Sequence, residues 1–170
     1  PGEPRQRHWV IRASEVILAT GTIERPIVFP GNDCPGVMLA DALVEYAQKY
    51  AAIPNGPVAL FTNNDTAYAV ALDLSRLGVS VSAIVDVRRD ISDFARFLAD
   101  KAGAELIAGQ AIVATAGGKA LKSISIRPFN ESTGKVSSTA RTIACTTLGV
   151  SGGWSPSIQL ASQAGGKPDW

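Results

Sequence analysis

The sequence predicts an α/β fold, a doubly wound sheet with an antiparallel meander, flanked by partial strands of a second domain. Three observations lead to this prediction. Between residues 57 and 103, short apolar runs alternate with amphipathic stretches, an order typical of parallel strands joined by right-handed crossovers. After Gly103 the apolar runs are short and separated by glycine-rich turns. Residues 15–21 form a further apolar run that ends in Ala-Thr-Gly, which we expect to be the last strand of a domain whose beginning is missing.

Composition limits the function classes. The 170 residues, of which 46% are hydrophobic, suffice for one full domain and pieces of another. The net charge of +1 gives no electrostatic case for nucleic acid or an anionic membrane as partner, and no apolar run approaches the ~20 residues of a membrane span. Cys34 and Cys145 form neither a CxxC pair nor a metal-ligand cluster. We therefore expect a cytoplasmic protein without metal and with reduced thiols, a disulfide between the two cysteines being the alternative.

The N-terminal part is predicted to contain two strands, a loop and a helix. Residues 8–13 and 16–18 have strand-like patterns, and prolines and glycines between residues 26 and 36 indicate a loop. From Val37 to Tyr50, apolar residues recur at spacings of three and four, which predicts an amphipathic helix.

A new unit is expected to open at Pro57. Residues 58–61 form a short apolar run of the kind found in buried parallel strands. A helix with Gly78 just past its C-terminus and a second strand at residues 79–85 should follow. Ser92 is placed to cap a third helix, which Gly103 would end.

The remaining sequence is predicted to be mostly strands, at residues 105–108, 111–115, 121–126 and 136–144. The last twenty residues are rich in glycine and serine and are not expected to form a core alone. We expect residues 1–30 and 145–170 either to be the least ordered parts or to pair with each other as neighbouring strands.

The turn after residues 58–61 is where a Rossmann-like nucleotide-binding domain carries G-x-G-x-x-G/A. Thr62, Asn64 and Ala67 stand at the three positions, and only Ala67 is small enough. Asp65 is expected to cap the next helix and to repel an incoming phosphate by about 1 kcal/mol. Asp86 stands where a ribose-binding acid belongs. Two hypotheses follow: the domain has kept its fold without its nucleotide, or it is an independently competent NAD(P)-binding module.

No catalytic residue can be assigned from motifs. His8 is the only histidine, and the chain has no G-x-S-x-G nucleophile motif. A flavin disulfide reductase would need paired cysteines, which the sequence does not contain.

Several motifs resemble the large α subunit of heterotetrameric sarcosine oxidases. They lie at residues 15–26, 32–38, 61–68, 151–156 and 163–166. The Thr-Asn-Asn-Asp turn and the Ser-Gly-Gly-Trp-Ser-Pro motif are far more specific than Ala-Thr-Gly, and the similarity runs through essentially the whole chain. The α-type subunits of opine oxidases and hydrogen cyanide synthases share parts of the pattern and are the alternative assignment.

The resemblance implies two dinucleotide-binding domains, the first of them split in sequence. Residues 1–36 would end its leading half, 37–54 would be a connecting helix and linker, 55–144 an inserted NAD(P)-binding-like domain, and 145–170 the return to the first domain.

The same resemblance implies a flavoprotein complex as the setting of the chain. The parent α subunit would bind NAD, and the complex would hold FAD and FMN. Oxidative demethylation of sarcosine would occur at flavin on a partner subunit. The expected partners are the other subunits and the missing parts of the chain's own α polypeptide. This segment alone is expected to be an inert oxidoreductase scaffold, with no cofactor bound to it as one alternative.

The resemblance also carries over two groups of cofactor-binding residues. The first, matching a strand end beside the dinucleotide, is Ala19, Thr20 and Gly21. The second, matching the returning segment that closes over the same ligand, is Ser151, Gly152, Gly153 and Trp154. The alternative for the second group is a tight turn with a packed tryptophan. Arg25 is expected to form an interdomain salt bridge rather than to contact substrate.

Overall fold

The computed structural model describes residues 5–167. The chain divides into two compact units: unit 1 combines the residues up to Thr22 with those from Pro156 onward, and unit 2 runs from Ile23 to Ser155. No helix in the described range is long and apolar enough to cross a bilayer.

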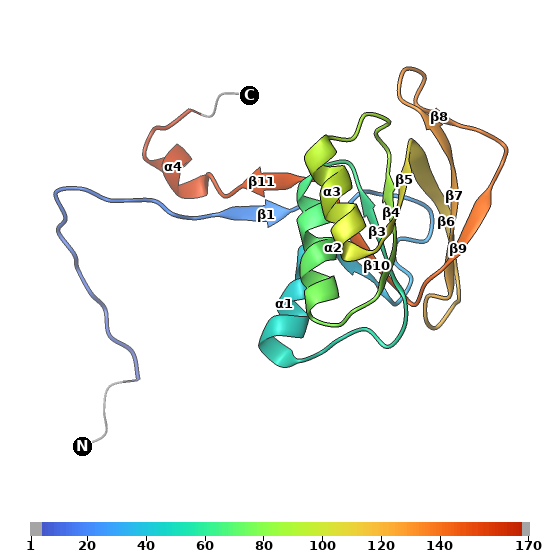
Figure 1. Ribbon diagram of the computed structural model, residues 1–170. Helices are drawn as coiled ribbons and strands as arrows, with labels where there is room; N and C mark the ends of the chain where they lie inside the picture. Colours follow the sequence, from blue (N-terminus) through green and yellow to red (C-terminus); the bar gives the residue numbers. More distant parts are fainter. Residues whose placement is uncertain (1–4, 168–170) are drawn as a thin grey trace. The chain divides into compact units, whose positions relative to one another are not determined.

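A five-stranded parallel sheet forms the centre of unit 2 (Figure 1). Its strands, in spatial order, are β2 (Val37–Leu39), β10 (Thr147–Ser151), β3 (Val58–Thr62), β4 (Val81–Asp86) and β5 (Glu105–Ala108). All neighbouring pairs run parallel. The side chains of β3 are buried on both faces, which is why its sequence is a continuous apolar run.

Three helices cover one face of this sheet, as Figure 1 shows: α1 (Ala40–Tyr50), α2 (Thr66–Arg76) and α3 (Asp93–Ala102). They bury a single apolar cluster with the sheet, which includes Leu43, Leu60, Leu74, Ile84 and Leu98. Burial of such side chains contributes roughly 1.5–3 kcal/mol each, so this helix–sheet contact is a main source of stability.

An antiparallel sheet covers the other face. It contains β6 (Gln110–Ala116), β7 (Ser123–Asn130), β8 (Lys135–Val136) and β9 (Arg141–Ala144), with β7 pairing all three others. Its inner side chains form a second hydrophobic cluster with those of the parallel sheet. In this cluster the rings of Phe29 and Phe61 pack edge to face, with 5.6 Å between their centroids. The predicted α/β fold with an antiparallel meander is thus confirmed, the meander taking the face opposite the helices.

Local signals in the sequence place the helix ends well. Ser92 Oγ accepts a hydrogen bond from the amide of Ala95 at 3.1 Å, as expected of an N-cap. Gly103, with φ of 70°, ends α3. Helix α1 ends differently, because Ala51 occupies the left-handed region with φ of 52°, a conformation that usually requires glycine.

Four predictions about elements were wrong. Val37 begins strand β2 rather than a helix, since it pairs in register with Leu148. The predicted strand at 136–144 is interrupted between β8 and β9. Residues 8–13 and 16–18 form no strand, because a strand requires a hydrogen-bonded neighbour and they pair with none in the described range. Finally, β10 was missed, although it lies between β2 and β3 in the sheet.

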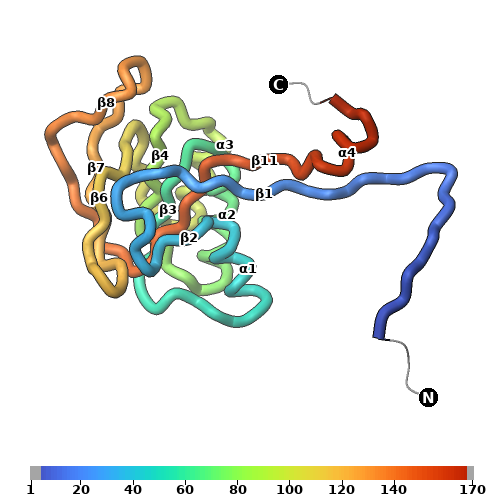
Figure 2. The backbone as a smooth tube through the Cα atoms, turned by 180° about the vertical axis from the view of Figure 1, so that it is seen from behind, coloured from blue at the N-terminus to red at the C-terminus, as the bar shows by residue number. Residues whose placement is uncertain are grey.

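Unit 1 is small in its described part. The amide of Ser157 donates to the carbonyl of Gly21 at 2.9 Å, and the hydroxyl of Thr20 donates to the carbonyl of Ser157 at 2.5 Å. The short helix α4 (Gln159–Gln163) follows. Strands β1 (Thr22–Glu24) and β11 (Trp154–Pro156) pair as a two-stranded ribbon, and the tube in Figure 2 follows both. The expectation that the two ends of the chain pair as neighbouring strands is confirmed for these residues.

Candidate functional site

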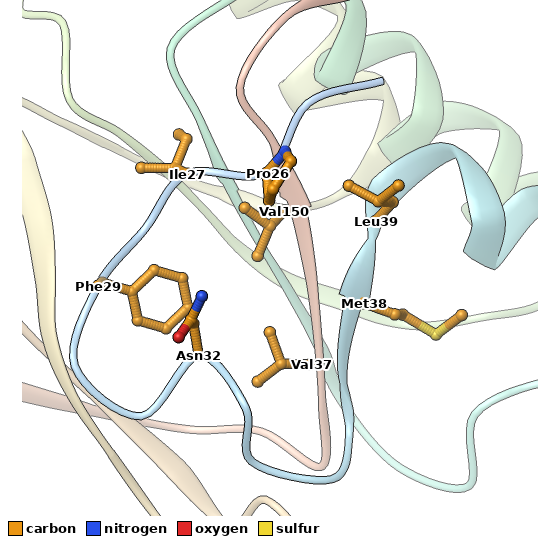
Figure 3. A pocket seen from close by; sticks show the side chains of 8 residues that line it. All are labelled: Pro26, Ile27, Phe29, Asn32, Val37, Met38, Leu39 and Val150. Atoms are coloured by element: carbon orange, nitrogen blue, oxygen red, sulfur yellow. The ribbon is translucent and has the colours of Figure 1, made fainter. Parts of the chain in front are cut away.

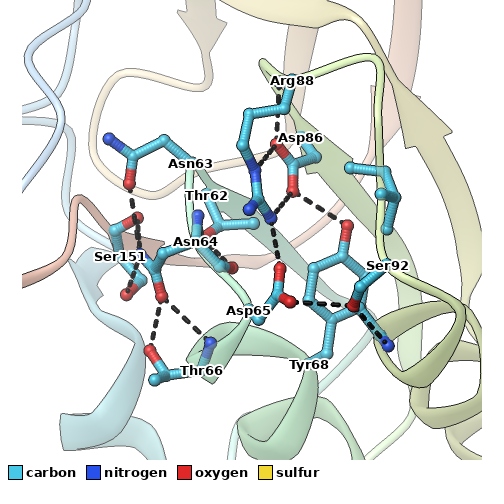
Figure 4. A network of polar contacts seen from close by, with 12 residues as sticks. Thr62, Asn63, Asn64, Asp65, Thr66, Tyr68, Asp86, Arg88, Ser92 and Ser151 are labelled. Atoms are coloured by element: carbon cyan, nitrogen blue, oxygen red, sulfur yellow. Dashed lines mark hydrogen bonds and ion pairs between the residues drawn. The ribbon is translucent and has the colours of Figure 1, made fainter.

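The polar residues at the carboxyl ends of β3, β4 and β10 form the candidate site, because ligands of open α/β sheets bind at this edge. Figure 4 shows them as two hydrogen-bonded clusters of one polar network, which are joined through the backbone of Asn64 and Asp65. Asn64 is the centre of the first cluster. Its Nδ2 donates to the carbonyl of Ser151 at 3.1 Å and to Ser151 Oγ at 3.2 Å. The side chain of Asn64 therefore ties the turn after β3 to the end of β10.

Asn64, not Asp65, caps helix α2. Its Oδ1 accepts from the amide of Thr66 at 3.1 Å, and its own amide donates to Thr62 Oγ1 at 3.0 Å. The prediction that Asp65 is the side-chain cap was wrong, since the backbone of Asp65 is already helical and its carboxylate bonds no helix amide.

The carboxylate of Asp65 instead binds two other side chains. Arg88 Nη2 donates to Oδ1 at 2.7 Å, and Ser92 Oγ donates to Oδ2 at 2.8 Å. These hydrogen bonds, first from Arg88 and then from Ser92, hold the pKa of Asp65 below its usual value. Asp65 is therefore a charged link between α2, the segment after β4 and α3.

Asp86 is fully buried at the end of β4. Its Oδ1 accepts from Arg88 N at 2.8 Å and Arg88 Nε at 3.1 Å. Its Oδ2 accepts from Arg88 Nη2 at 2.8 Å and from the Tyr68 hydroxyl at 2.9 Å. A carboxylate has about four lone-pair positions, and these contacts use all of them. Asp86 therefore has no acceptor left for a ribose hydroxyl.

The same contacts shift the ionisation of the partners of Asp86. Burial, followed by the charge of Asp86, raises the pKa of Tyr68. The hydrogen bonds to Asp86 raise the pKa of Arg88. Tyr68 thus remains a neutral donor and Arg88 a permanent cation, so the network keeps its hydrogen bonds across the physiological pH range.

The predicted residues 151–154 lie beside this network in unit 2, and each of them contacts the chain itself. Ser151 receives the bonds from Asn64, and the indole of Trp154 donates to Thr66 Oγ1 at 3.0 Å. The amide of Gly152 donates to the carbonyl of Arg25 at 2.6 Å. A Cβ on Gly152 would lie 2.9 Å from the carbonyl oxygens of Arg25 and Pro26. The close approach that requires glycine here is thus made by the chain's own backbone.

Gly153 and Arg25 complete this turn. Gly153 has φ of 93°, and its carbonyl accepts from the amide of Arg25 at 2.8 Å. Arg25 forms no ion pair with any residue in the described range. The expected salt bridge of Arg25 therefore stays a prediction.

The other predicted group, Ala19, Thr20 and Gly21, belongs to unit 1 and is exposed. Gly21 has φ of 67°, and an added Cβ there would meet nothing within 4 Å. Among the described residues, the positive φ is therefore the reason for glycine at that position. The carbonyl of Gly21 is engaged by the amide of Ser157.

The turn and its neighbours do not fit a bound dinucleotide in unit 2. Ala67 is buried against the sheet, as its position in the motif predicts. The side chain of Asn64, however, spans the gap between β3 and β10 where phosphate would meet bare backbone. Asp86 and Arg88 are hydrogen-bonded and ion-paired with each other. Sequence reasoning missed Arg88, although its place two residues after Asp86 was a usable signal.

Neither cysteine is in a disulfide, and burial raises the pKa of Cys145 to about 11, so this thiol is unreactive near neutral pH. Within residues 5–167, no group of three or more His, Cys, Asp or Glu side chains is placed to hold a metal. An apolar pocket of about 200 Å³ lies beside β2 (Figure 3), lined by Pro26, Ile27, Phe29, Asn32, Val37, Met38, Leu39 and Val150.

Comparisons with known proteins agree with this geometry in fold. The thioredoxin reductase of T. acidophilum superposes with a TM-score of 0.60 at 12% identity, over 88% of this chain and 47% of that one. A 6-hydroxypseudooxynicotine amine oxidase from Pseudomonas geniculata N1 gives a TM-score of 0.62 at 20% identity, over 89% of this chain and 23% of that one. These likenesses show that the chain shares its α/β fold with domains of these oxidoreductases.

Sequence relatives narrow the class. The sarcosine oxidase α subunit of Rhizobium meliloti (strain 1021) is 40% identical over 167 residues, 98% of this chain and 16% of that protein. An opine oxidase subunit of Agrobacterium tumefaciens (strain Ach5) is 36% identical over 45% of the chain and 15% of that protein. The hydrogen cyanide synthase subunit HcnB of Pseudomonas aeruginosa is 27% identical over 91% of the chain and 37% of that protein. No family model matches.

The chain groups with the α subunits of sarcosine oxidase and corresponds to one segment of them. It spans about a sixth of the length of the Rhizobium relative, at 16%.

Proposed function

We propose that this chain is a segment of the α subunit of a sarcosine oxidase-like amine oxidoreductase, in which unit 2 is a nucleotide-free scaffold. The observation that carries the proposal is the closure of the carboxyl edge of the sheet. The side chain of Asn64 connects the turn after β3 to β10, and Arg88 forms ion pairs with both Asp65 and Asp86. Internal ligands thus fill the positions that a dinucleotide would need.

The dinucleotide of the parent subunit belongs, in this proposal, to the domain that unit 1 begins. The exposed residues 19–21 form one wall of that NAD site, and residues 151–154 return the chain to the same domain. The rest of the α polypeptide supplies the phosphate-binding turn. FAD and FMN would be held elsewhere in the complex, and sarcosine would be demethylated at flavin on a partner subunit.

Two observations support this division. The apolar side chains of Val16 and Ile17 are 75% and 91% exposed, although a buried strand would cover them. The relatives are themselves subunits of larger enzymes, which fits a chain completed by other polypeptide. We infer that residues 15–18 become a strand once their neighbours are present.

The test uses the intact α polypeptide that contains this segment. Gly21→Val is expected to lower the NAD content of the purified polypeptide by at least several-fold, since a side chain would enter the wall of the site. Gly134→Val is a matched control, because Gly134 also has positive φ, at 65°, and open space around it, but lies in the hairpin between β7 and β8. Equal NAD content in the wild type and Gly21→Val would reject the assignment.

An alternative within the same class is the α-type subunit of an opine oxidase or a hydrogen cyanide synthase. The sequence similarity to such subunits supports this alternative. Substrate oxidation by the assembled complex distinguishes the candidates: release of formaldehyde from sarcosine supports the sarcosine oxidase assignment, whereas turnover of an opine or of glycine alone supports the others.

A further inference from the structure

One buried carboxylate takes no part in the network described above. Glu24, at the end of β1, is 6% exposed. Its Oε2 accepts a hydrogen bond from the amide of Asp41, in the first turn of α1, at 3.0 Å. Its Oε1 is buried and has no hydrogen-bond partner in the described range. A buried oxygen of this kind is costly unless the group is neutral or finds a donor.

The surroundings of Glu24 contain no compensating cation within the described residues. From α1, the carboxylate of Asp41 adds a second negative charge, and from β10 the hydroxyl of Ser151 lies next to the side chain. Arg25 follows Glu24 in sequence but forms no ion pair in that same range. Burial of a carboxylate without a nearby cation disfavours its ionised form, so the geometry shifts the balance of Glu24 toward the neutral acid.

Ionisation follows the same balance. Burial raises the pKa of Glu24, and the charge of Asp41 raises it further; the Ser151 hydroxyl and the Asp41 amide act in the opposite direction. The net effect is a raised pKa.

Glu24 also lies where the chain passes between its two units. The chain enters unit 2 at Ile23 and leaves it after Ser155. Glu24 connects the incoming segment to α1 through Asp41, and its neighbour Ser151 is tied to Asn64. A change at Glu24 therefore acts on the segment that links unit 2 to the rest of the chain.

We propose that Glu24 is a proton-dependent latch: as the neutral acid it holds the incoming segment against α1 and β10, and loss of its proton loosens that segment. In the neutral form, the buried carboxyl group carries no charge that requires water or a cation. In the ionised form, the carboxylate needs water, which reaches it only if the segment moves outward. This device goes beyond the proposed function and does not depend on a nucleotide.

The sign of the pH dependence follows from linkage. A group whose pKa is raised on folding contributes stability below its unfolded pKa and loses it as the pH rises through the folded pKa. The free energy of unfolding should therefore fall with rising pH through this range. Glu24→Gln keeps a neutral side chain of the same shape and should remove that fall.

The experiment is denaturant unfolding of the chain between pH 4 and 8, for wild type, Glu24→Gln and Glu45→Gln. Glu45 is a matched control because it is exposed and pairs with Lys49 on the surface of α1. We expect Glu24→Gln to gain stability over wild type progressively as the pH rises, while Glu45→Gln runs parallel to wild type. Parallel curves for wild type and Glu24→Gln, or a gap that opens toward acid, would overturn the proposal.

Hydrogen exchange of the Asp41 amide tests the proposal even if Glu24→Gln does not fold. In wild type, the amide proton of Asp41 should exchange faster with rising pH than intrinsic base catalysis explains, because ionised Glu24 releases it. Asp41→Asn removes the neighbouring charge, lowers the pKa of Glu24 and should move this loss of protection to lower pH. Protection that follows intrinsic exchange alone in both proteins would contradict the latch.

Discussion

At the scale of residues, side chains that a nucleotide-binding domain would offer to its ligand are used by this chain for its own structure. The side chain of Asn64 links the turn after β3 to the end of β10 and to helix α2, with both halves of its amide engaged. Asp86 satisfies its four acceptor positions with Arg88 and Tyr68. Ionic and polar groups that are fully paired in this way rigidify a site, and removing one partner is costly.

Asn64→Ala should lower the free energy of unfolding by about 1–3 kcal/mol, because it removes a helix cap and leaves the end of β10 without its donor. Denaturant unfolding monitored by circular dichroism measures this. Asn63→Ala is the control: Asn63 is the adjacent, exposed residue, and its side chain only accepts from Asn64 Nδ2, so its loss should cost less than about 0.5 kcal/mol. Equal effects of the two substitutions would show that the bridge to Ser151 contributes nothing.

The ion pair of Asp65 should make the free energy of unfolding sensitive to acid. Because its pKa is lowered in the folded state, it contributes stability above its unfolded pKa and loses it as the pH falls through the folded value. Its side chain is 46% exposed, so the contribution should stay below about 1 kcal/mol. Asp65→Asn should therefore lose less stability than wild type between neutral and acid pH, and a steeper acid loss in the variant would refute the ion pair with Arg88.

At the scale of elements, sequence patterns predicted those whose signals are local. The runs at 58–61 and 105–108, the cap at Ser92 and the glycine after α3 all correspond to structure. Strand β10 escaped prediction because it owes its place to pairing with β2 and β3, which are far away in the sequence. The apolar residues of β2 matched a helical spacing that continues into α1, so the boundary between them could not be seen.

The C-terminus of α1 offers a test of backbone conformation. Ala51→Gly should stabilise the chain by about 0.5–1 kcal/mol, because glycine adopts the left-handed conformation at φ of 52° without steric cost. Ala52→Gly is the control, since the structure gives Ala52 no positive φ, and added backbone freedom there should be neutral or destabilising. Melting temperatures of the three proteins compare them directly. A lower melting temperature for Ala51→Gly than for Ala52→Gly would contradict this conformation.

At the scale of the whole molecule, the sequence predicted the α/β class and the oxidoreductase family but not the internal closure of the site. The glycine-poor turn predicted a poor phosphate site, and this stays a prediction. The partners of Asp65, Arg88 and Ser92, could not be predicted from the sequence. They lie 23 and 27 residues away along the chain and come close to Asp65 only in the folded structure. The domain boundaries at 36, 54 and 144 stay predictions. The compact units divide after residues 22 and 155, which places β10 in the same unit as β3.

The central claim is that unit 2 is a Rossmann-type scaffold whose nucleotide edge is filled by its own side chains. Calorimetric titration of the chain with NAD, NADP and FAD tests it most directly. The account predicts no saturable heat for any of the three at ligand concentrations of about 1 mM, where a working site would be mostly occupied. Saturable binding of NAD tighter than about 0.1 mM, lost in Asn64→Ala, would contradict it, because the closed edge would then be a functional site.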